Sequence, residues 1–350
     1  AANLVVGQVP RFLLQAITFG SIIVITLVLL ATSGGDLGQV VPTLGVFAFA
    51  GQRLLPALNN VYNNATKMRF GKPALDAFYT DLMEKKIDQK ELQRLQGAQN
   101  VSALSLNQSL DLLDVQFWYP HSDRPALRDL NLHIPARRTV GVIGPTGAGK
   151  TTLVDVILGL LSPTKGKLTV DNVVISKENI YSWQRNLGYV PQQIFLADDT
   201  VEANIAFGVP KKQIHRDSVK RAARIAELHE FVVRELSQGY ETRVGERGVR
   251  LSGGQRQRIG IARALYHDPD VLILDEATSA LDNITEKAVM RAVHNLSNKK
   301  TIILIAHRLS TVRNCDTIFM LEQGRLKDQG TYSELWERNP EFQKMASLTE

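Results

Sequence analysis

A phosphate-binding pattern lies near the middle of the chain, at residues 144–151. The segment reads GPTGAGKT and fits G-x-x-x-x-G-K-[ST]. Its glycines permit backbone conformations in which successive N–H groups turn inward around a polyphosphate. Lys150 is then placed to reach the β and γ phosphates, and the Thr151 hydroxyl to hold Mg²⁺. The residues expected to contact the nucleotide are Gly144, Pro145, Thr146, Gly147, Ala148, Gly149, Lys150, Thr151 and Thr152.

A second group of reactive side chains follows an apolar run. VLILD, residues 271–275, is apolar up to its carboxylate, as expected of a strand buried in a parallel sheet. The carboxyl end of such a strand is where an α/β sheet places its ligands. We expect Asp275 to bind Mg²⁺ through water. Glu276 is expected to act as general base, polarising the water that attacks a γ phosphate.

The flanking sequence indicates the elements that position these groups. TVGVI, residues 139–143, has the composition of a strand, and the apolar pattern after the loop indicates a helix whose positive end faces the anion. LSGGQ, residues 251–255, lies at the start of another helix. There Ser252, Gly253 and Gly254 offer a hydroxyl and free backbone N–H groups. Both helix starts are therefore candidate phosphate sites.

These motifs together resemble a known family. LSGGQRQRIGIARAL at residues 251–265 and VLILDEATSALD at residues 271–282 are similar to the nucleotide-binding domain of ATP-binding cassette (ABC) transporters. The resemblance covers about residues 110–350 and implies an α/β P-loop NTPase, an ABC cassette with a helical subdomain, that uses ATP and Mg²⁺. In this family the signature of one cassette closes on the ATP held by a second, so dimerisation is part of the mechanism. The resemblance thus assigns ATP contacts to Ser252, Gly253, Gly254 and Gln255.

The resemblance implies three further roles near the γ phosphate. Gln192, in YVPQQ, is similar to the glutamine that senses the γ phosphate and Mg²⁺, although Gln193 beside it leaves the register open by one. His307, in LIAHRLS, resembles the switch histidine that contacts the γ phosphate. Asp282, which closes SALD, resembles the aspartate that links the two sites of a dimer.

An aromatic pair before the loop resembles the family's adenine-stacking position. Tyr119 in FWYP is the expected stacking residue, with Trp118 beside it as the alternative. The expected catalytic residues are Lys150, Gln192, Glu276 and His307, and the expected metal ligands are Thr151, Gln192 and Asp275.

Two apolar segments at the N-terminal end predict a transmembrane hairpin over residues 1–80. Helices are expected at about residues 10–31 and 39–70, because residues 12–31 carry no charge and are long enough to cross a bilayer. A second apolar segment follows immediately, which argues against a cleaved signal peptide. The connector between the two helices, residues 32–39, has no lysine or arginine, so the outer ends of both helices are expected in the cytoplasm. The second helix is expected to project beyond the membrane. The basic residues that set this orientation are Arg11, Lys67, Arg69 and Lys72.

Arg53 is the one charge between residues 37 and 66. A charge inside a membrane is costly, so Arg53 should face protein or a water-filled cavity. It shares a polar helical stripe with Asn60, Asn64 and Lys67. Two interpretations stay open: contact with an anionic substrate, or a structural contact between helices.

Other features favour an exporter. TRVGERG, residues 242–248, looks like the x-loop of ABC exporters, and membrane helices fused before a cassette favour a half-transporter. Such a protein has six spanning helices, so this chain resembles its last two helices plus the nucleotide-binding domain. Val-Pro-Arg at residues 9–11 with Arg53 looks similar to flippases of lipid-linked oligosaccharides, ahead of exporters of drug, peptide or other lipid cargo. The implied substrate is lipid-linked and anionic.

Composition separates the rival interpretations. The net charge is +6, but basic and acidic residues are interspersed without a long basic run, so a nucleic-acid partner is not expected. Residues 81–109 are charged and Gln-rich and predict a cytoplasmic linker before a nucleotide-binding domain at 110–350. The single cysteine, Cys315, permits no internal disulfide. We therefore expect a multi-pass protein of the inner or cell membrane with a cytoplasmic cassette, active as a homodimer. The alternatives are a soluble ABC ATPase acting on nucleic acid or ribosomes, and a membrane ATPase that signals to a partner.

Overall fold

The computed structural model describes residues 2–32, 37–84, 102–249, 251–276, 283–306 and 308–347. The chain divides into two compact units, Ala1–Gln96 and Gly97–Glu350. These are called the helical unit and the cassette unit below.

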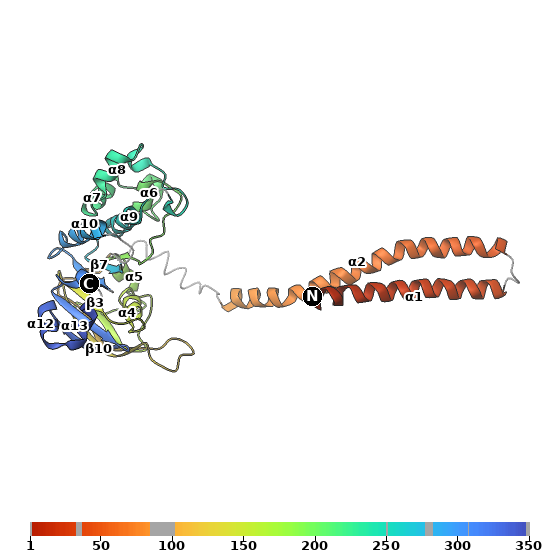
Figure 1. The fold of residues 1–350 in the computed structure, drawn as a ribbon, viewed down its shortest axis with the longest axis horizontal. Helices are drawn as coiled ribbons and strands as arrows, with labels where there is room; N and C mark the ends of the chain where they lie inside the picture. The colour runs from red at the N-terminus through yellow and green to blue at the C-terminus, as the bar shows by residue number, and fades with distance from the viewer. Residues whose placement is uncertain are drawn as a thin grey trace. The chain divides into compact units, whose positions relative to one another are not determined.

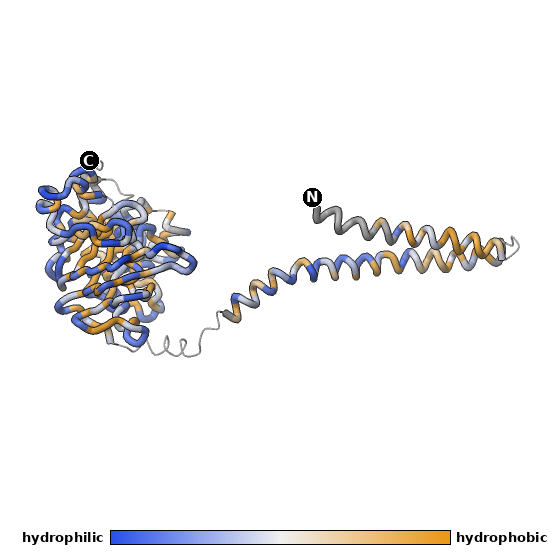
Figure 2. Tube along the Cα trace, turned by 90° about the horizontal axis from the view of Figure 1, so that it is seen from below, coloured by the Kyte–Doolittle hydropathy of each residue, from blue (hydrophilic) through white to orange (hydrophobic). Residues whose placement is uncertain are grey.

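The helical unit contains two long helices, α1 (Ala2–Thr32) and α2 (Leu37–Glu84), which lie side by side in Figure 1. They are in contact near Gly51, where an added Cβ would lie 3.7 Å from Thr18 Cγ2, an ordinary van der Waals distance. Within them, Gln15–Thr32 and Val40–Met83 are long and apolar enough to cross a membrane. Figure 2 shows apolar residues concentrated on the parts of both helices nearest their connection.

The structure extends both helices beyond the predicted limits. The sequence analysis placed the helix ends near residues 10 and 70, but α1 begins at Ala2 and α2 ends at Glu84. Three prolines, Pro42, Pro56 and Pro73, lie inside α2 without ending it. Residues 74–84 include Ala, Leu, Met and Glu, which favour helix, so the pattern continues after Pro73.

A six-stranded sheet forms the centre of the cassette unit, in the order β10-β9-β3-β8-β7-β6. The strands are β3 (Thr139–Ile143), β6 (Leu187–Val190), β7 (Val271–Asp275), β8 (Thr301–Ile305), β9 (Thr317–Glu322) and β10 (Arg325–Gly330). All neighbouring pairs are parallel except β9 with β10. Continuous apolar runs such as VLILD make β3, β7 and β8 the buried centre of this sheet, because both of its faces are covered.

A second, antiparallel sheet of four strands has the order β2-β1-β4-β5. Its strands are β1 (Ser109–Phe117), β2 (Leu127–Pro135), β4 (Lys165–Val170) and β5 (Val173–Val174). Leucines of β1 and β2 share one hydrophobic core with α4 (Lys150–Ile157) and with Ile273 of β7. The helix after the phosphate-binding loop is therefore held in the core that these two sheets share.

A group of helices is inserted between β6 and β7. It comprises α6 (Val201–Ile205), α7 (Arg216–Ile225), α8 (His229–Glu235) and α9 (Gly253–Leu265), with short 3₁₀ turns at Lys211–Gln213, Gly239–Glu241 and Glu246–Gly248. Figure 1 shows these helices at the opposite end of the cassette unit from β10. The other helices are α5 (Ile180–Gln184), α10 (Asn283–His294), α11 (Leu309–Val312), α12 (Tyr332–Arg338) and α13 (Pro340–Ser347).

Part of the predicted linker belongs to the cassette unit. Leu106 is buried, and its N–H donates to Asp270 Oδ2 at 3.2 Å. The N–H of Leu104 donates to the Ser182 carbonyl at 2.9 Å. Residues 104–108 are thus anchored to the cassette before β1 begins, although the sequence analysis assigned them to the linker. The segment is Leu-Ser-Leu-Asn-Gln, and contacts with residues far along the chain hold it in place.

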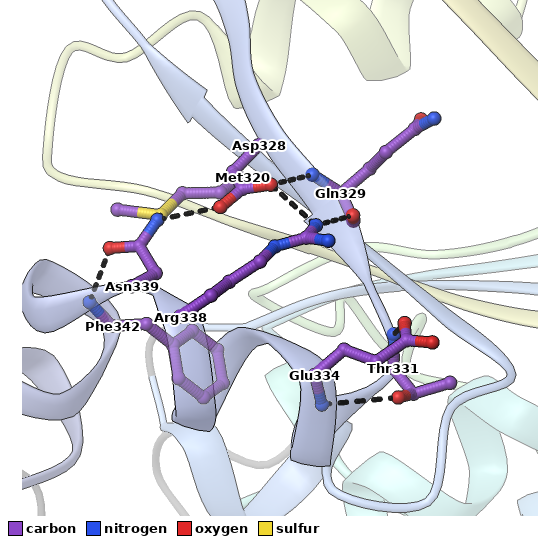
Figure 3. Close-up of polar contacts among 8 residues, drawn as sticks. All are labelled: Met320, Asp328, Gln329, Thr331, Glu334, Arg338, Asn339 and Phe342. Atoms are coloured by element: carbon purple, nitrogen blue, oxygen red, sulfur yellow. Dashed lines mark hydrogen bonds and ion pairs between the residues drawn. The ribbon is translucent and has the colours of Figure 1, made fainter.

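The two C-terminal helices are attached to β9 and β10 by a polar network (Figure 3). Arg338 and Asn339 both donate to the Asp328 carboxylate, at 2.7 and 2.9 Å. Asn339 Oδ1 accepts from the N–H of Phe342 at 3.1 Å, and the Phe342 ring is fully buried. One side chain therefore both caps α13 and joins it to β10.

Candidate functional site

The phosphate-binding loop follows β3 and ends where α4 begins at Lys150. Gly144 has φ of 151°, and a Cβ there would lie 2.3 Å from the Leu321 carbonyl oxygen. Gly149 has φ of 98°, and its Cβ would lie 2.8 Å from the Ala126 carbonyl oxygen. These two positions therefore require glycine for both conformation and space. Residues 145–147 are exposed at the tip of the loop.

Lys150 lies inside the loop and is buried, with 6% of its surface exposed. Its Nζ donates to the carbonyl oxygens of Gly144 at 2.8 Å and Pro145 at 3.1 Å. Burial lowers the pKa of the ammonium, and the nearby carboxylates of Glu276 and Asp275 act in the opposite direction. A buried cation surrounded by loop carbonyls is a suitable partner for a polyphosphate, whose oxygens could replace those carbonyls.

The carboxylates reach this lysine because the parallel strands end at one edge of the sheet. β8 lies between β3 and β7. The N–H of Ala306 donates to the Val142 carbonyl at 3.1 Å, and that of Glu276 to the Ile305 carbonyl at 3.0 Å. These bonds align the carboxyl ends of the three strands. The sheet thus brings Lys150 into electrostatic contact with both predicted carboxylates.

Asp275 is partly buried at the end of β7. Burial raises its pKa, and the negative charge of Glu276 raises it further. The hydroxyl of Tyr189 on β6 donates to Asp275 Oδ2 at 3.3 Å. Burial also raises the pKa of the Tyr189 phenol to about 12, with the Asp275 charge as the next cause. The phenol therefore remains a hydrogen-bond donor at neutral pH.

Gln192 follows β6 and reaches the second carboxylate. Its Nε2 donates to Glu276 Oε2 at 2.5 Å. Gln193 is exposed beside it. This contact favours Gln192 in the register that the sequence left open. Glu276 has φ of 48°, a left-handed backbone conformation in which a non-glycine residue is uncommon. Such an outlier is found more often at functional positions than elsewhere.

Tyr119 lies close to the start of α4. Its hydroxyl is 3.2 Å from Thr152 Oγ1, and its ring meets the Phe117 ring edge to face at 5.0 Å. Tyr119 is 43% exposed, so part of the residue remains accessible to a ligand. The backbone N–H of Trp118 donates to Thr164 Oγ1 at 3.3 Å. The structure thus favours Tyr119 over Trp118 as the ring beside the loop.

The signature segment is ordered at the start of α9, a helix that packs against α6, α7 and β6. Ser252 caps the helix: its Oγ accepts from the Gln255 N–H at 3.2 Å, while Gln255 Oε1 accepts from the Ser252 N–H at 2.8 Å. Ser252 and Gly253 are exposed. Among the described residues, no hydrogen bond or ion pair joins residues 252–255 to residues 144–151. One chain therefore presents two separate candidate phosphate surfaces.

Three further residues were predicted to take part in function. His307 and Asp282 lie outside the described residues. Arg53 belongs to the helical unit, where its guanidinium lies 5.4 Å from the centre of the Phe49 ring and its side chain is exposed.

The sequence analysis did not identify Tyr189 as part of the site. The available signal was a single phenol in an otherwise apolar strand, LGYV at residues 187–190, which is followed by Pro191. A tyrosine in a strand is ordinarily explained by packing. Only the pairing of β6 with β7 shows that its hydroxyl reaches Asp275.

Comparisons with known proteins agree with this geometry. Residues 127–279 match the family model described as "ABC transporter". The chain is 42% identical over 239 residues to the heterocyst differentiation ATP-binding protein HepA of Nostoc sp., covering 68% of this chain and 39% of that protein. It is 44% identical over 227 residues to the ATP-dependent lipid A-core flippase of Cupriavidus metallidurans, covering 65% of this chain and 38% of that protein.

A solved structure of a bacterial Atm1-family ABC exporter with ATP bound has a TM-score of 0.65 and 33% identity, covering 91% of this chain and 60% of that one. The chain spans less than half the length of the HepA protein and of the lipid A-core flippase.

Proposed function

Because this chain belongs to the ABC transporter family and contains its ATP-binding domain, we propose that the whole protein uses ATP to export or flip a substrate across a membrane. The observation that carries the proposal is the joint placement of a buried Lys150 in the loop and the carboxylates of Asp275 and Glu276 at the same edge of the sheet. Relatives named as flippase and exporter support the direction of transport.

The loop residues have separate roles toward ATP. Backbone N–H groups of residues 144–151 would surround the phosphates, and α4 would add its positive end. Lys150 would exchange its bonds to the Gly144 and Pro145 carbonyls for bonds to phosphate oxygens. The accessible part of Tyr119 would stack on adenine.

The polar groups at this edge also fit a magnesium ion. Oxygen donors are what Mg²⁺ prefers, and the Asp275 carboxylate, the Thr151 hydroxyl and the Gln192 amide oxygen are the residues that would hold it. When bound, Mg²⁺ neutralises charge on the β and γ phosphates. The partly buried Asp275, whose pKa is raised by burial and by the charge of Glu276, would gain an opposite charge there.

Glu276 is the proposed general base. Its carboxylate would accept a hydrogen bond from the attacking water and orient that water toward the γ phosphorus. Gln192 already donates to one oxygen of this carboxylate, so it can hold Glu276 in a fixed rotamer. His307 is proposed to contact the γ phosphate and Asp282 to join the two sites; both lie outside the described residues.

The separation of the two phosphate surfaces supports a dimer. The signature residues 252–255 would close on the ATP held by the loop of a second copy. The second copy's signature would in turn close on the ATP held by residues 144–151 of the first. ATP would then stabilise the closed pair of cassettes, and hydrolysis would release it. Because Lys150, Asp275, Glu276 and Ser252 all have the functional residue types, both sites of a homodimer could act.

The helical unit would place the protein in the inner or cell membrane as part of a multi-pass assembly. Large apolar side chains on both helices are exposed, including Phe19 at 63%, Leu27 at 62% and Phe49 at 61%. Lipid or further membrane helices would cover them. The basic residues beyond the apolar spans would keep the cassette in the cytoplasm.

Substrate identity is the finer part of the proposal. Arg53 presents an exposed cation on α2, and Asn60 and Asn64 follow on the same stripe. Such a stripe suits an anionic, lipid-linked substrate in a water-filled path. The flippase relative is named for a lipid substrate, which agrees with this class.

The test uses the full-length protein in nanodiscs, with ATPase activity measured against lipids, lipid-pyrophosphate sugars and drugs. Stimulation by the lipid-pyrophosphate class that is lost in Arg53→Ala supports the proposed substrate. Gln52→Ala is the matched control, because Gln52 is an exposed polar residue of α2 beside Arg53 and off the polar stripe. An Arg53→Ala variant that responds like wild type would make Arg53 structural, and a protein that moves no substrate into or out of vesicles would refute transport itself.

A further inference from the structure

Tyr189 lies on the strand next to the one that ends in the carboxylates. It pairs in parallel register with Ile273 of β7. Side chains two residues apart on a strand share a face, so Ile273 and Asp275 project to the same side of the sheet. That side carries the core around α4, against which Tyr189 packs. The long phenol side chain can therefore extend along this face from the level of Ile273 to the end of β7.

The hydroxyl of Tyr189 meets one particular oxygen of Asp275. It donates to Oδ2 at 3.3 Å. The last torsion of an aspartate is broad, so an unsupported carboxylate rotates with little cost. A donor on Oδ2 restricts that rotation and leaves Oδ1 as the oxygen that would serve the metal site. The donor also offsets part of the repulsion between Asp275 and the adjacent Glu276 charge.

We infer that Tyr189 is a positioning residue for the metal-binding carboxylate, acting through its hydrogen bond to Asp275. This inference rests on the proposed function, in which Asp275 holds Mg²⁺. Hydrogen-bond partners that orient a metal-binding group typically change metal affinity or activity about 10- to 100-fold when they are removed. A purely structural role predicts instead that loss of the hydroxyl changes stability alone.

The experiment compares the removal of two tyrosine hydroxyl groups, one at a time, in the full-length protein. Tyr189→Phe keeps the ring in the core and removes the hydroxyl. Tyr266→Phe is the matched control, because Tyr266 is 5% exposed and its hydroxyl accepts from the His215 N–H at 3.0 Å, in the inserted helices. The affinity for a non-hydrolysable ATP analogue is measured in excess EDTA and again in excess Mg²⁺. The ratio of the two affinities is the gain linked to the metal.

We expect Tyr189→Phe to reduce the magnesium-linked gain about tenfold while its affinity in EDTA stays at the wild-type value. Tyr266→Phe should keep the full gain. A Tyr189→Phe variant with the wild-type gain would overturn the inference, as would equal losses in the two variants. Thermal unfolding without nucleotide, measured on both variants, shows whether any loss follows unfolding of the cassette, which would also count against a positioning role.

Asp275→Asn distinguishes this inference from the function on which it rests. If Asp275→Asn removes the magnesium-linked gain and Tyr189→Phe does not, only the role of Tyr189 fails. If Asp275→Asn keeps the full gain, the proposed metal site itself is wrong.

Discussion

Replacing Lys150 by methionine should separate the stability of the cassette from its affinity for nucleotide. The wild-type ammonium is buried, and burial lowers its pKa, so its charged form is less stable in the folded protein than in water. Methionine retains an unbranched chain and removes the charge. The two lost bonds from the ammonium to loop carbonyls cost about 1.5 to 3 kcal/mol each, and relief from the desolvation of a buried charge, on the order of several kcal/mol, offsets most of this cost. We expect the nucleotide-free variant to differ from wild type by about 1 kcal/mol or less in its free energy of unfolding.

The nucleotide-bound states should differ much more. At ATP concentrations about 100 times the wild-type Kd, binding stabilises the wild type by about 2.7 kcal/mol. Loss of charge-assisted bonds from Lys150 to phosphate should weaken binding roughly 100-fold, since each such bond contributes about 1.5 to 3 kcal/mol. At the same ATP concentration the variant then gains only about 0.4 kcal/mol. For a domain of this size the difference corresponds to roughly 5 to 9 °C in Tm.

The assay is thermal unfolding of the full-length protein with and without ATP and Mg²⁺. Lys177→Met, at an exposed lysine outside the site, controls for the loss of a surface charge and should keep the full ATP-induced shift. An equal ATP-induced shift in Lys150→Met and wild type would refute the reasoning. The pH dependence adds a second check. Because the folded pKa is lowered from 10.5, stability of the wild type should rise as pH increases from the folded pKa toward 10.5, and this rise should be absent in Lys150→Met.

Three further predictions concern the cassette unit. Burial would raise the pKa of Asp171, but hydrogen bonds from three backbone N–H groups outweigh it and lower the pKa. Asp171→Asn should therefore reduce the free energy of unfolding by about 1 kcal/mol at pH 7, measured by denaturant unfolding. That difference should disappear as the pH falls below 3.8 and through the lower folded pKa, because the wild-type carboxylate then protonates. Tyr119→Phe should retain ATP affinity and Tyr119→Leu should lose about tenfold, measured by equilibrium binding; equal affinities for all three would exclude stacking. Asn339→Ala should speed hydrogen exchange throughout α13 by removing its cap and its bond to Asp328 (Figure 3), and unchanged exchange would contradict the role of the cap.

The sequence predicted the fold class because its strongest signals are local. A β-branched strand, a glycine loop and a helix at residues 139–157 specify their own conformations. The prediction of an α/β P-loop NTPase with helices preceding it is confirmed by the matching family and the exporter structure. Assignments of individual site residues remain predictions, and the geometry adds contacts that favour Gln192 and Tyr119.

What the sequence did not show depends on contacts between distant residues. Leu106 is held by Asp270, 164 positions away, and a short segment without a periodic pattern gives no local sign of such an anchor. Tyr189 is likewise placed beside Asp275 only by the pairing of two strands that are separated by the inserted helices. The end of α2 at Glu84 was missed because the sequence analysis took the second helix only to about residue 70, whereas the favourable residues after Pro73 continue the helix.

The most direct test of the central claim is single-turnover hydrolysis of radiolabelled ATP by full-length protein carrying Glu276→Gln. Glu337→Gln serves as control, because Glu337 is an exposed glutamate on α12, away from the loop. If Glu276 is the base for ATP held by the loop, the Glu276→Gln variant should bind ATP with wild-type affinity and lose about 100-fold or more of its hydrolysis rate. Hydrolysis by Glu276→Gln at the rate of wild type and of Glu337→Gln would contradict the account.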